Sequence, residues 1–166
     1  INAEVKEIFD GRSNVYGELT GDGAGPTLLL CGHLDTVPPN NMEIEPFKAY
    51  LENGRIYGRG TADMKGGIAA MLLAMAAIKR AGVGLKGTVK FAGVVGEESP
   101  NTSEGARALV ANGKIADMAI VGEATKLDIA AAHKGMEWLK IEVKGKAAHG
   151  SVPEHGINAI VKATKL

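Results

Sequence analysis

Short runs of strand-forming residues alternate with helical patterns along this chain, and this alternation constrains the fold more than any other feature. Apolar residues at helical spacing predict a long helix over 64–80 and a shorter one over 103–111. Strands that alternate with helices are typical of an α/β sheet with helices on both faces, so we predict an α/β fold. The expected strands of this sheet lie at 14–19, 27–31, 87–95 and 118–121.

Glycine makes up 23 of the 166 residues, about twice the usual share of ~7%, and it marks the predicted turns. The glycine-rich segment 21–26 predicts a hairpin turn between the first two strands, and Asn53-Gly54 predicts another within 49–58. A dinucleotide-binding loop follows a strand and opens a helix, whereas the segment 21–26 precedes a strand. We therefore expect no dinucleotide site there.

The composition argues against two classes of partner. Nineteen Lys and Arg balance nineteen Asp and Glu, and 4% of residues are aromatic, so the chain lacks the charge and stacking surface typical of nucleic-acid binding. The longest apolar stretch, 66–78, falls short of the roughly 20 residues that cross a bilayer, so no membrane span is expected. The single cysteine, Cys31, stands in an apolar run and is expected to be buried in a protein of the reducing cytoplasm.

The two ends of the sequence predict a piece of a longer protein. The chain begins with Ile1 rather than Met, and it ends within a helical pattern over 156–166. In that pattern Ile157, Ile160 and Val161 share one face. We therefore expect a fragment.

Polar residues that can bind a metal follow three of the predicted strands. In an open α/β sheet, ligands bind beyond the carboxyl ends of the strands, so these side chains are expected to converge. A further carboxylate, Asp63, stands just before the long helix and joins them. The residues at the strand ends are His33 and Asp35, then Glu97 and Glu98, then Glu123.

Taken singly, these residues have ordinary explanations, such as a helix cap for Asp63 and a solvated surface position for each Glu. Taken together, five carboxylates around one imidazole would repel one another unless a cation neutralised them. A mixed set of nitrogen and oxygen ligands suits zinc, with manganese or cobalt possible. Of the adjacent pair Glu97 and Glu98, one side chain can bind metal while the other faces the substrate as a general base.

Four motifs in these segments resemble a known family. In chain order they read GHLDTVP at 32–38, YGRGTADMKGG at 57–67, GEE at 96–98 and VGE at 121–123. They resemble the dinuclear-zinc amidohydrolases and peptidases, the family of acetylornithine deacetylase, succinyl-diaminopimelate desuccinylase, aminoacylase and glutamate carboxypeptidase. The motifs run from residue 32 to residue 123 of the 166. The resemblance implies a zinc-peptidase-like mixed sheet with helices on both faces.

The resemblance implies a role for each residue of the cluster. His33 and Glu123 would bind one zinc, Glu98 would bind the second, and Asp63 would bridge the two, followed by a cis peptide bond to Met64. Asp35 would hold the His33 ring in the tautomer that presents the correct nitrogen to the metal. Glu97 would take a proton from a metal-bridged water, which is the nucleophile, and later deliver it to the departing amine.

Towards the C-terminus, HKG at 133–135 and GKAAHGS at 145–151 resemble the passage of this family into a smaller α+β lid and dimerisation domain. The implied boundaries are 1–134 for an incomplete catalytic metal-binding domain and 135–166 for the first strand, at 137–143, and helix of the lid. His149 would reach the active site of the partner subunit in a homodimer and stabilise the oxyanion, although a loop histidine without a role is an equal alternative. His133 and His155 are interpreted as structural or surface residues.

The sequence lacks two features of the family, a last metal-binding histidine near the C-terminus and a helical segment before the first motif. The second zinc would therefore lack a protein ligand, and the 166 residues alone are expected to bind metal weakly at that position and to catalyse poorly. The main hypothesis is a zinc-dependent hydrolase that cleaves the amide bond of a small N-acyl amino acid or a short peptide. A non-catalytic metal-binding module and a purely structural domain are the alternatives, and Glu97 distinguishes the enzyme from the module, because a binding module does not need a carboxylate that stays free of the metal.

Overall fold

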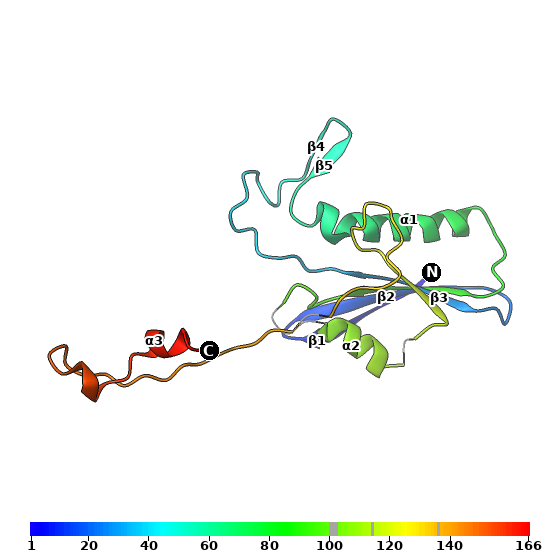
Figure 1. Ribbon diagram of the computed structural model, residues 1–166. Helices are drawn as coiled ribbons and strands as arrows, with labels where there is room; N and C mark the ends of the chain where they lie inside the picture. The colour runs from blue at the N-terminus through cyan, green and yellow to red at the C-terminus, as the bar shows by residue number, and fades with distance from the viewer. Residues whose placement is uncertain (100–102, 114, 136) are drawn as a thin grey trace. The chain divides into compact units, whose positions relative to one another are not determined.

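A computed structural model of the chain describes residues 1–99, 103–113, 115–135 and 137–166 (Figure 1). The chain divides into two compact units, Ile1–Ile129 and Ala130–Leu166. Each unit is described by itself below.

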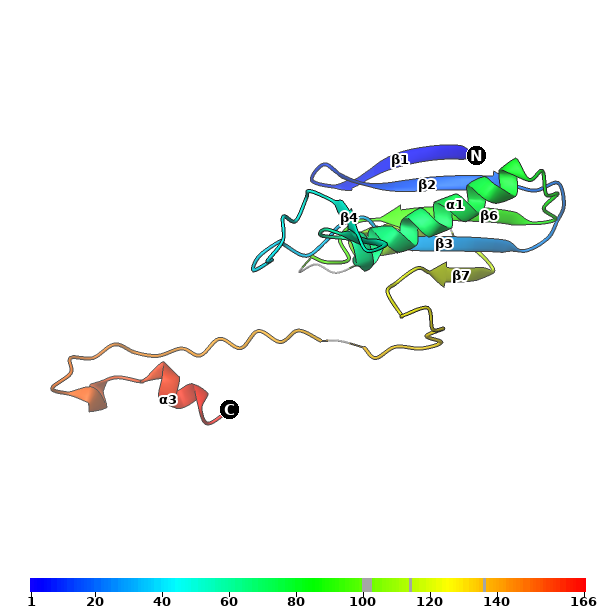
Figure 2. The same cartoon turned by 90° about the horizontal axis from the view of Figure 1, so that it is seen from above.

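The first unit is built on a five-stranded sheet with the order β1-β2-β6-β3-β7 (Figure 2). Strand β3 is parallel to both of its neighbours, whereas β2 is antiparallel to both of its own, so the sheet is mixed as predicted. The α/β fold class is confirmed. The strands are β1 (Asn2–Phe9), β2 (Arg12–Thr20), β3 (Thr27–His33), β6 (Thr88–Val94) and β7 (Met118–Val121).

One helix covers each face of the sheet, α1 (Gly66–Arg80) on one side and α2 (Glu104–Ala111) on the other (Figure 1). Successive residues of a strand point to opposite faces. Leu30 accordingly packs in a cluster with Met71 and Met75 of α1, while its neighbour Leu29 packs with Leu109 of α2. Helices on both faces are therefore confirmed.

The predicted hairpin between the first two strands is wrong. Strand β6 lies between β2 and β3, because β3 pairs along its whole length with β6 in parallel. The glycine-rich segment 21–26 instead runs against 85–87, where the N–H of Gly21 donates to Gly87 O at 3.0 Å and that of Gly25 to Lys86 O at 2.7 Å. A Cβ atom at Gly21 would overlap the carbonyl of Leu85, so this close approach of two backbones requires the glycine.

The second predicted hairpin is confirmed as β4 (Tyr50–Glu52) and β5 (Arg55–Tyr57). Its turn residues Asn53 and Gly54 have φ angles of 50° and 74°, as a two-residue hairpin turn requires. Strand β1 was not predicted from the sequence, because most of its residues are exposed and it shows no buried apolar alternation.

The long predicted helix is confirmed as α1, and a short π-helical turn, η1 (Thr61–Lys65), precedes it. Taken as one stretch, Thr61–Arg80 is long and apolar enough to pass a composition test for crossing a membrane, a test that core helices of other proteins also pass. Ile68, Met71 and Met75 of this stretch are buried on the sheet.

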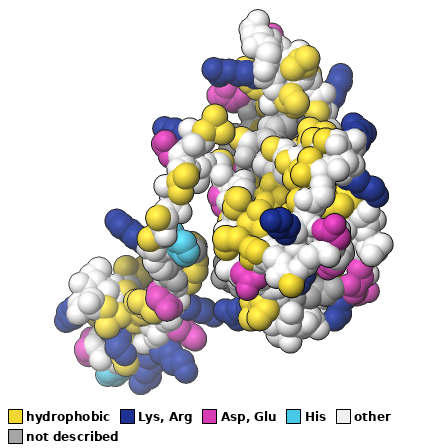
Figure 3. Space-filling view, turned by 90° about the vertical axis from the view of Figure 1, so that its right-hand side faces the viewer, with side chains coloured by type: hydrophobic (Ala, Val, Ile, Leu, Met, Phe, Trp, Pro, Cys, Tyr) yellow, Lys and Arg dark blue, Asp and Glu magenta, His cyan; other side chains and the backbone are white. Residues whose placement is uncertain are grey.

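Apolar side chains also remain exposed on the first unit. They include Leu72 and Leu73 of α1 and Ile120 of the edge strand β7. On the face drawn in Figure 3, apolar side chains are interspersed with charged ones of both signs.

In the second unit the described residues form η2 (Pro153–His155), α3 (Ala159–Ala163) and a single bridge between Lys146 and Ile157. Asn158 caps α3 by accepting hydrogen bonds from Ile160 N and Val161 N. The strand predicted over 137–143 is not formed, because these residues pair with no other strand among the described residues, and Trp138 is 79% exposed.

Candidate metal centre

The parallel strands of the sheet bring the predicted ligands to one edge. His33 is the last residue of β3 and lies opposite Val94, so the residues that follow β6, Glu97 and Glu98, continue beside it. Glu123 follows β7, the other parallel neighbour of β3. The convergence predicted from the strand ends is therefore observed.

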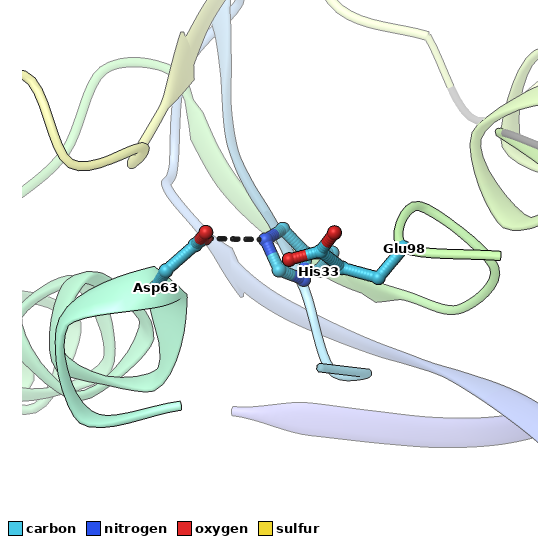
Figure 4. Close-up of side chains that lie close together, drawn as sticks. All are labelled: His33, Asp63 and Glu98. Carbon is cyan, nitrogen blue, oxygen red and sulfur yellow. Dashed lines mark hydrogen bonds and ion pairs between the residues drawn. The ribbon is translucent and has the colours of Figure 1, made fainter. Parts of the chain in front are cut away.

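The His33 side chain lies at the middle of this cluster and is 2% exposed. Its Nε2 atom lies 2.9 Å from Asp63 Oδ1, 3.6 Å from Glu123 Oε1 and 4.0 Å from Glu97 Oε2. One ligand atom each of His33, Asp63 and Glu98 lie within 4.8 Å of one another. Asp63 and Glu98 approach the ring from opposite sides, the first from η1 and the second from the segment after β6 (Figure 4).

The orientation of the His33 ring is set by the main chain of Asp35. Nδ1 lies 2.9 Å from the Asp35 carbonyl oxygen and 3.8 Å from the Asp35 carboxylate. A carbonyl oxygen can only accept, so Nδ1 carries the hydrogen and Nε2 is the atom available to a metal. The resemblance implied that Asp35 holds the ring, and the atom of Asp35 nearest to Nδ1 is its carbonyl oxygen rather than its carboxylate.

The Asp35 carboxylate has different partners. It accepts the backbone N–H of Glu98 at 2.9 Å and that of Glu97 at 3.3 Å. Hydrogen bonds from two consecutive amides to a carboxylate are charge-assisted. Asp35 therefore connects the residue that orients the imidazole with the segment that carries the two glutamates.

Electrostatics in the cluster favour proton retention. Burial alone would lower the pKa of His33, but the hydrogen bonds to Asp63 and to the Asp35 carbonyl outweigh it, helped by the charges of Glu123 and Glu97. The pKa of His33 therefore lies above its ordinary value of 6.5. A proton on Nε2 would be stabilised by Asp63, in the place where a cation would bind.

Two of the carboxylates also have raised pKa values. For Glu98 the causes are burial first and then the charges of Asp63 and Glu97, which outweigh the opposing effect of His33. For Glu123, burial again comes first, and Asp63 and Glu97 contribute against the opposing effect of His33. A divalent cation would neutralise the excess negative charge around the buried imidazole nitrogen. The nitrogen and oxygen atoms of these side chains form a donor set that fits zinc.

Met64, directly after Asp63, contacts the backbone of His33 and was not singled out from the sequence. Its side chain is fully buried, and its sulfur accepts the backbone N–H of His33 at 3.1 Å. The Asp63-Met64 peptide bond is cis, as the resemblance implied. In sequence Met64 resembles the other apolar residues of the helix that follows, so its contact with His33 gave no signal.

A small cavity adjoins the ligands. It has a volume of about 120 Å³ and is lined by Asp63, Glu98, Val37 and the loop 58–62. A larger cavity of about 290 Å³ lies on the α2 side of the sheet and is lined by Tyr16, Leu29 and Leu109 among others. The small cavity therefore offers space beside the predicted metal ligands.

Two further predictions concern single residues. Cys31, expected to be buried, is half-buried, and its burial together with the charge of Glu123 raises the pKa of its thiol. His149 belongs to the second unit, where Nδ1 lies 2.8 Å from Ser151 Oγ and accepts the Ser151 N–H at 3.3 Å.

The chain is similar to known proteins in sequence and in fold. The model of peptidase family M20/M25/M40 matches residues 29–165. The chain belongs to this family. The predicted family is therefore confirmed, and membership in a family of metallopeptidases implies a divalent metal, for which His33, Asp63 and Glu98 form a possible group.

Curated relatives in the M20/M25/M40 family include deacylases. A probable succinyl-diaminopimelate desuccinylase from Staphylococcus epidermidis is 36% identical over 96% of this chain and 40% of its own length. An acetylornithine deacetylase from Aliivibrio fischeri is 40% identical over 95% of this chain and 41% of its own length. The chain thus spans about two fifths of the length of these relatives.

Solved structures in the family include peptidases. A tripeptidase from Staphylococcus aureus superposes with a TM-score of 0.68 at 27% identity, over 99% of this chain and 45% of the other. An M20 family metallo-carboxypeptidase from Sulfolobus solfataricus superposes with a TM-score of 0.63 at 29% identity, over 74% of this chain and 28% of the other. The mixed sheet and its helices therefore match M20 catalytic domains.

Proposed function

We propose that the complete protein to which this chain belongs is a metal-dependent hydrolase of amide bonds in small N-acyl amino acids or short peptides. The observation that carries the proposal is the group of ligand atoms from His33, Asp63 and Glu98, with the Glu97 carboxylate beside it. The names of the relatives, a desuccinylase and a deacetylase, support the acyl substrates, and the structural neighbours support peptides.

His33 and Glu123 would hold one metal ion, Glu98 the second, and Asp63 would lie between them. Zinc fits this donor set best, and cobalt or manganese are possible replacements. When bound, the metal pair supplies Lewis acidity that acidifies a water and polarises the scissile carbonyl. The distance of 2.9 Å between His33 Nε2 and Asp63 Oδ1 supports this assignment, because a carboxylate so close to the ring nitrogen can share a metal with it.

Glu97 would be the general base. Its carboxylate is half exposed and lies 4.0 Å from His33 Nε2, farther than those of Asp63 at 2.9 Å and Glu123 at 3.6 Å. A carboxylate beside the metal ligands that does not itself bind metal can take a proton from the attacking water and deliver it to the leaving amine. The Asp35 carboxylate would support this by holding the Glu97 amide.

The second unit would belong to a lid and dimerisation domain that begins at residue 135, after a catalytic domain over 1–134. His149 would act in the partner subunit of a homodimer and donate a hydrogen bond to the oxyanion. Its contacts support this role, since Nδ1 accepts the Ser151 N–H and the proton of the neutral ring must then lie on Nε2. The single thiol of Cys31 supports a cytoplasmic location.

Substitution of Glu97 by Gln in the complete protein tests the proposal. We expect zinc content to stay unchanged while hydrolysis of N-acetyl and N-succinyl amino acids and of di- and tripeptides falls by about 10²–10⁴-fold, as the loss of a general base predicts. Glu45→Gln, an exposed carboxylate outside the cluster, is the matched control and should keep full activity. Undiminished activity of Glu97→Gln would show that the base is assigned wrongly, and an inactive wild type that still binds zinc would favour a metal-binding module.

A further inference from the structure

Asn14 is a polar residue in the middle of the first unit, and its side chain is fully buried. It lies on β2, and like Tyr16 two residues later it faces the side of the sheet that α2 covers. Its amide group donates to Tyr16 Oη at 2.8 Å and to Gly105 O at 2.9 Å, and its Oδ1 accepts the N–H of Val95 at 3.0 Å. Burial of a side-chain amide lowers the stability of a fold unless the amide forms such hydrogen bonds.

Two of these partners flank the segment that carries Glu97 and Glu98. Val95 directly follows β6, and Gly105 lies in the first turn of α2. Gly105 N also donates to Val95 O at 2.9 Å. The bonds of Asn14 therefore join the point where the chain leaves the sheet to the point where it enters the helix.

The packing at this junction leaves no room for a side chain at Gly105. A Cβ atom on Gly105 would overlap both Val95 O and Asn14 Oδ1. Ser103 N donates to Gly96 O at 2.8 Å, and Gly96 has a φ angle of 78°, in the region that favours glycine. The two ends of the segment are thus joined by hydrogen bonds between Gly105 and Val95 and between Ser103 and Gly96.

The same segment is also held at Glu97 and Glu98 themselves. The carboxylate of Asp35 accepts the backbone N–H groups of both residues. The two glutamates therefore lie between two anchors from different strands, Asp35 after β3 and Asn14 on β2. We expect a shift of either anchor to change the direction of both carboxylates, because the backbone of Glu97 and Glu98 has no other hydrogen bonds among the described residues.

We propose that Asn14 is a positioning residue for Glu97 and Glu98, holding the backbone that aims the one at the substrate and the other at the metal. Asn14 itself touches neither. The inference rests on the proposed function for the consequences in catalysis, but the anchoring of the segment stands on geometry alone and can be measured separately.

The first test measures amide hydrogen exchange in the metal-free complete protein. Asn14→Leu removes the three hydrogen bonds with a side chain of similar size. The control is Met75→Ala, which opens a cavity under the far half of α1 and lowers stability without touching the segment. We expect the amides of Glu97 and Glu98 to exchange at least about tenfold faster in Asn14→Leu than in Met75→Ala. Equal exchange in both variants would overturn the proposal.

The second test uses the metal-loaded protein and compares the same variants. Loss of a group that orients metal ligands typically costs about 10–100-fold in metal affinity or activity, so we expect the second zinc of Asn14→Leu to bind that much more weakly. We also expect kcat to fall by about 10–100-fold with KM changed less than about threefold, because the defect lies in the reacting groups. If Asn14→Leu matches Met75→Ala in zinc affinity and kcat, its role is structural only and the proposal fails.

Asn14→Asp serves where Asn14→Leu does not fold. It keeps the acceptor for Val95 N–H but places an oxygen against Gly105 O, so we expect the same faster exchange at Glu97 and Glu98. An inactive wild type would contradict the proposed function, while the exchange data would still decide whether Asn14 holds the segment.

Discussion

His33 Nδ1 lies 2.9 Å from the main-chain carbonyl of Asp35 but 3.8 Å from the Asp35 carboxylate. The ring is therefore oriented by an atom that no substitution removes. The carboxylate is left for the amides of Glu97 and Glu98. One short turn after β3 thus connects the imidazole proposed to bind metal to the segment that carries the proposed base.

Asp35→Ala is therefore expected to spare the first zinc. The carbonyl still holds the His33 ring, so the variant should keep one zinc, as counted by native mass spectrometry of the complete protein. The loss of the acceptor for two amides should lower kcat by about 10–100-fold. Asp22→Ala, in a loop at the other end of the sheet, is the control and should keep wild-type activity. Loss of both zinc ions from Asp35→Ala would instead mean that the carboxylate is what holds the ring.

The metal-free protein is expected to lose stability as pH rises. His33, Glu98 and Glu123 all have raised pKa values, so at these groups the folded state binds more protons than the unfolded state. Their contribution to the free energy of unfolding is complete below the ordinary values and is lost above them. The loss begins above 4.5 for the carboxylates and above 6.5 for the histidine.

Urea unfolding in the presence of a chelator measures this trend. We expect the decline in the free energy of unfolding between about pH 5 and pH 8 to be shallower when Glu98 and Glu123 are both replaced by Gln, since two of the three raised groups are then gone. Saturating zinc should oppose the decline in the wild type, because zinc binds the deprotonated ligands. A decline of equal slope in the double variant would show that these carboxylates are not its source.

The isolated 166-residue chain is expected to hold one zinc tightly and a second weakly or not at all. His33, Asp63 and Glu123 can supply three protein ligands to the first ion, whereas Glu98 and the bridging Asp63 supply two to the second. Native mass spectrometry, after circular dichroism has shown that the chain is folded, gives the count. Glu123→Gln should weaken the tight zinc, and Glu43→Gln, an exposed control, should not. A folded chain that takes up no zinc would contradict the whole metal assignment.

The convergence of His33, Glu98 and Glu123 was predictable because it depends on strand ends alone. Parallel strands place their carboxyl ends at one edge, and the pattern of apolar residues located those ends within one or two positions. The pairing of strands was less predictable. The glycine-rich segment 21–26 indicates a turn but does not say which strands lie side by side, and β6, from much later in the chain, is inserted between β2 and β3.

Asn14 shows why the supporting residues could not be predicted. An asparagine in a strand-like run is typical of a solvent-facing position. Its burial depends on Val95 and Gly105, which are distant in sequence and reach it only in the folded sheet. The segment 137–143 also shows that local sequence does not reveal the partner of an element. Its residues have strand-forming side chains but no partner strand among the described residues.

Met64→Ala is expected to impair metal binding as well as stability. The side chain is fully buried among Leu30, Ile68 and Phe91, so its truncation should lower the free energy of unfolding by about 2–5 kcal/mol. Met64 also accepts the His33 N–H and adjoins Asp63, so the cavity opens directly beneath two ligands. Met75→Ala, equally buried but far along α1, should lose similar stability and keep its zinc affinity. Urea unfolding and zinc titration of both variants decide the point, because a purely structural role for Met64 would give the two variants the same zinc affinity.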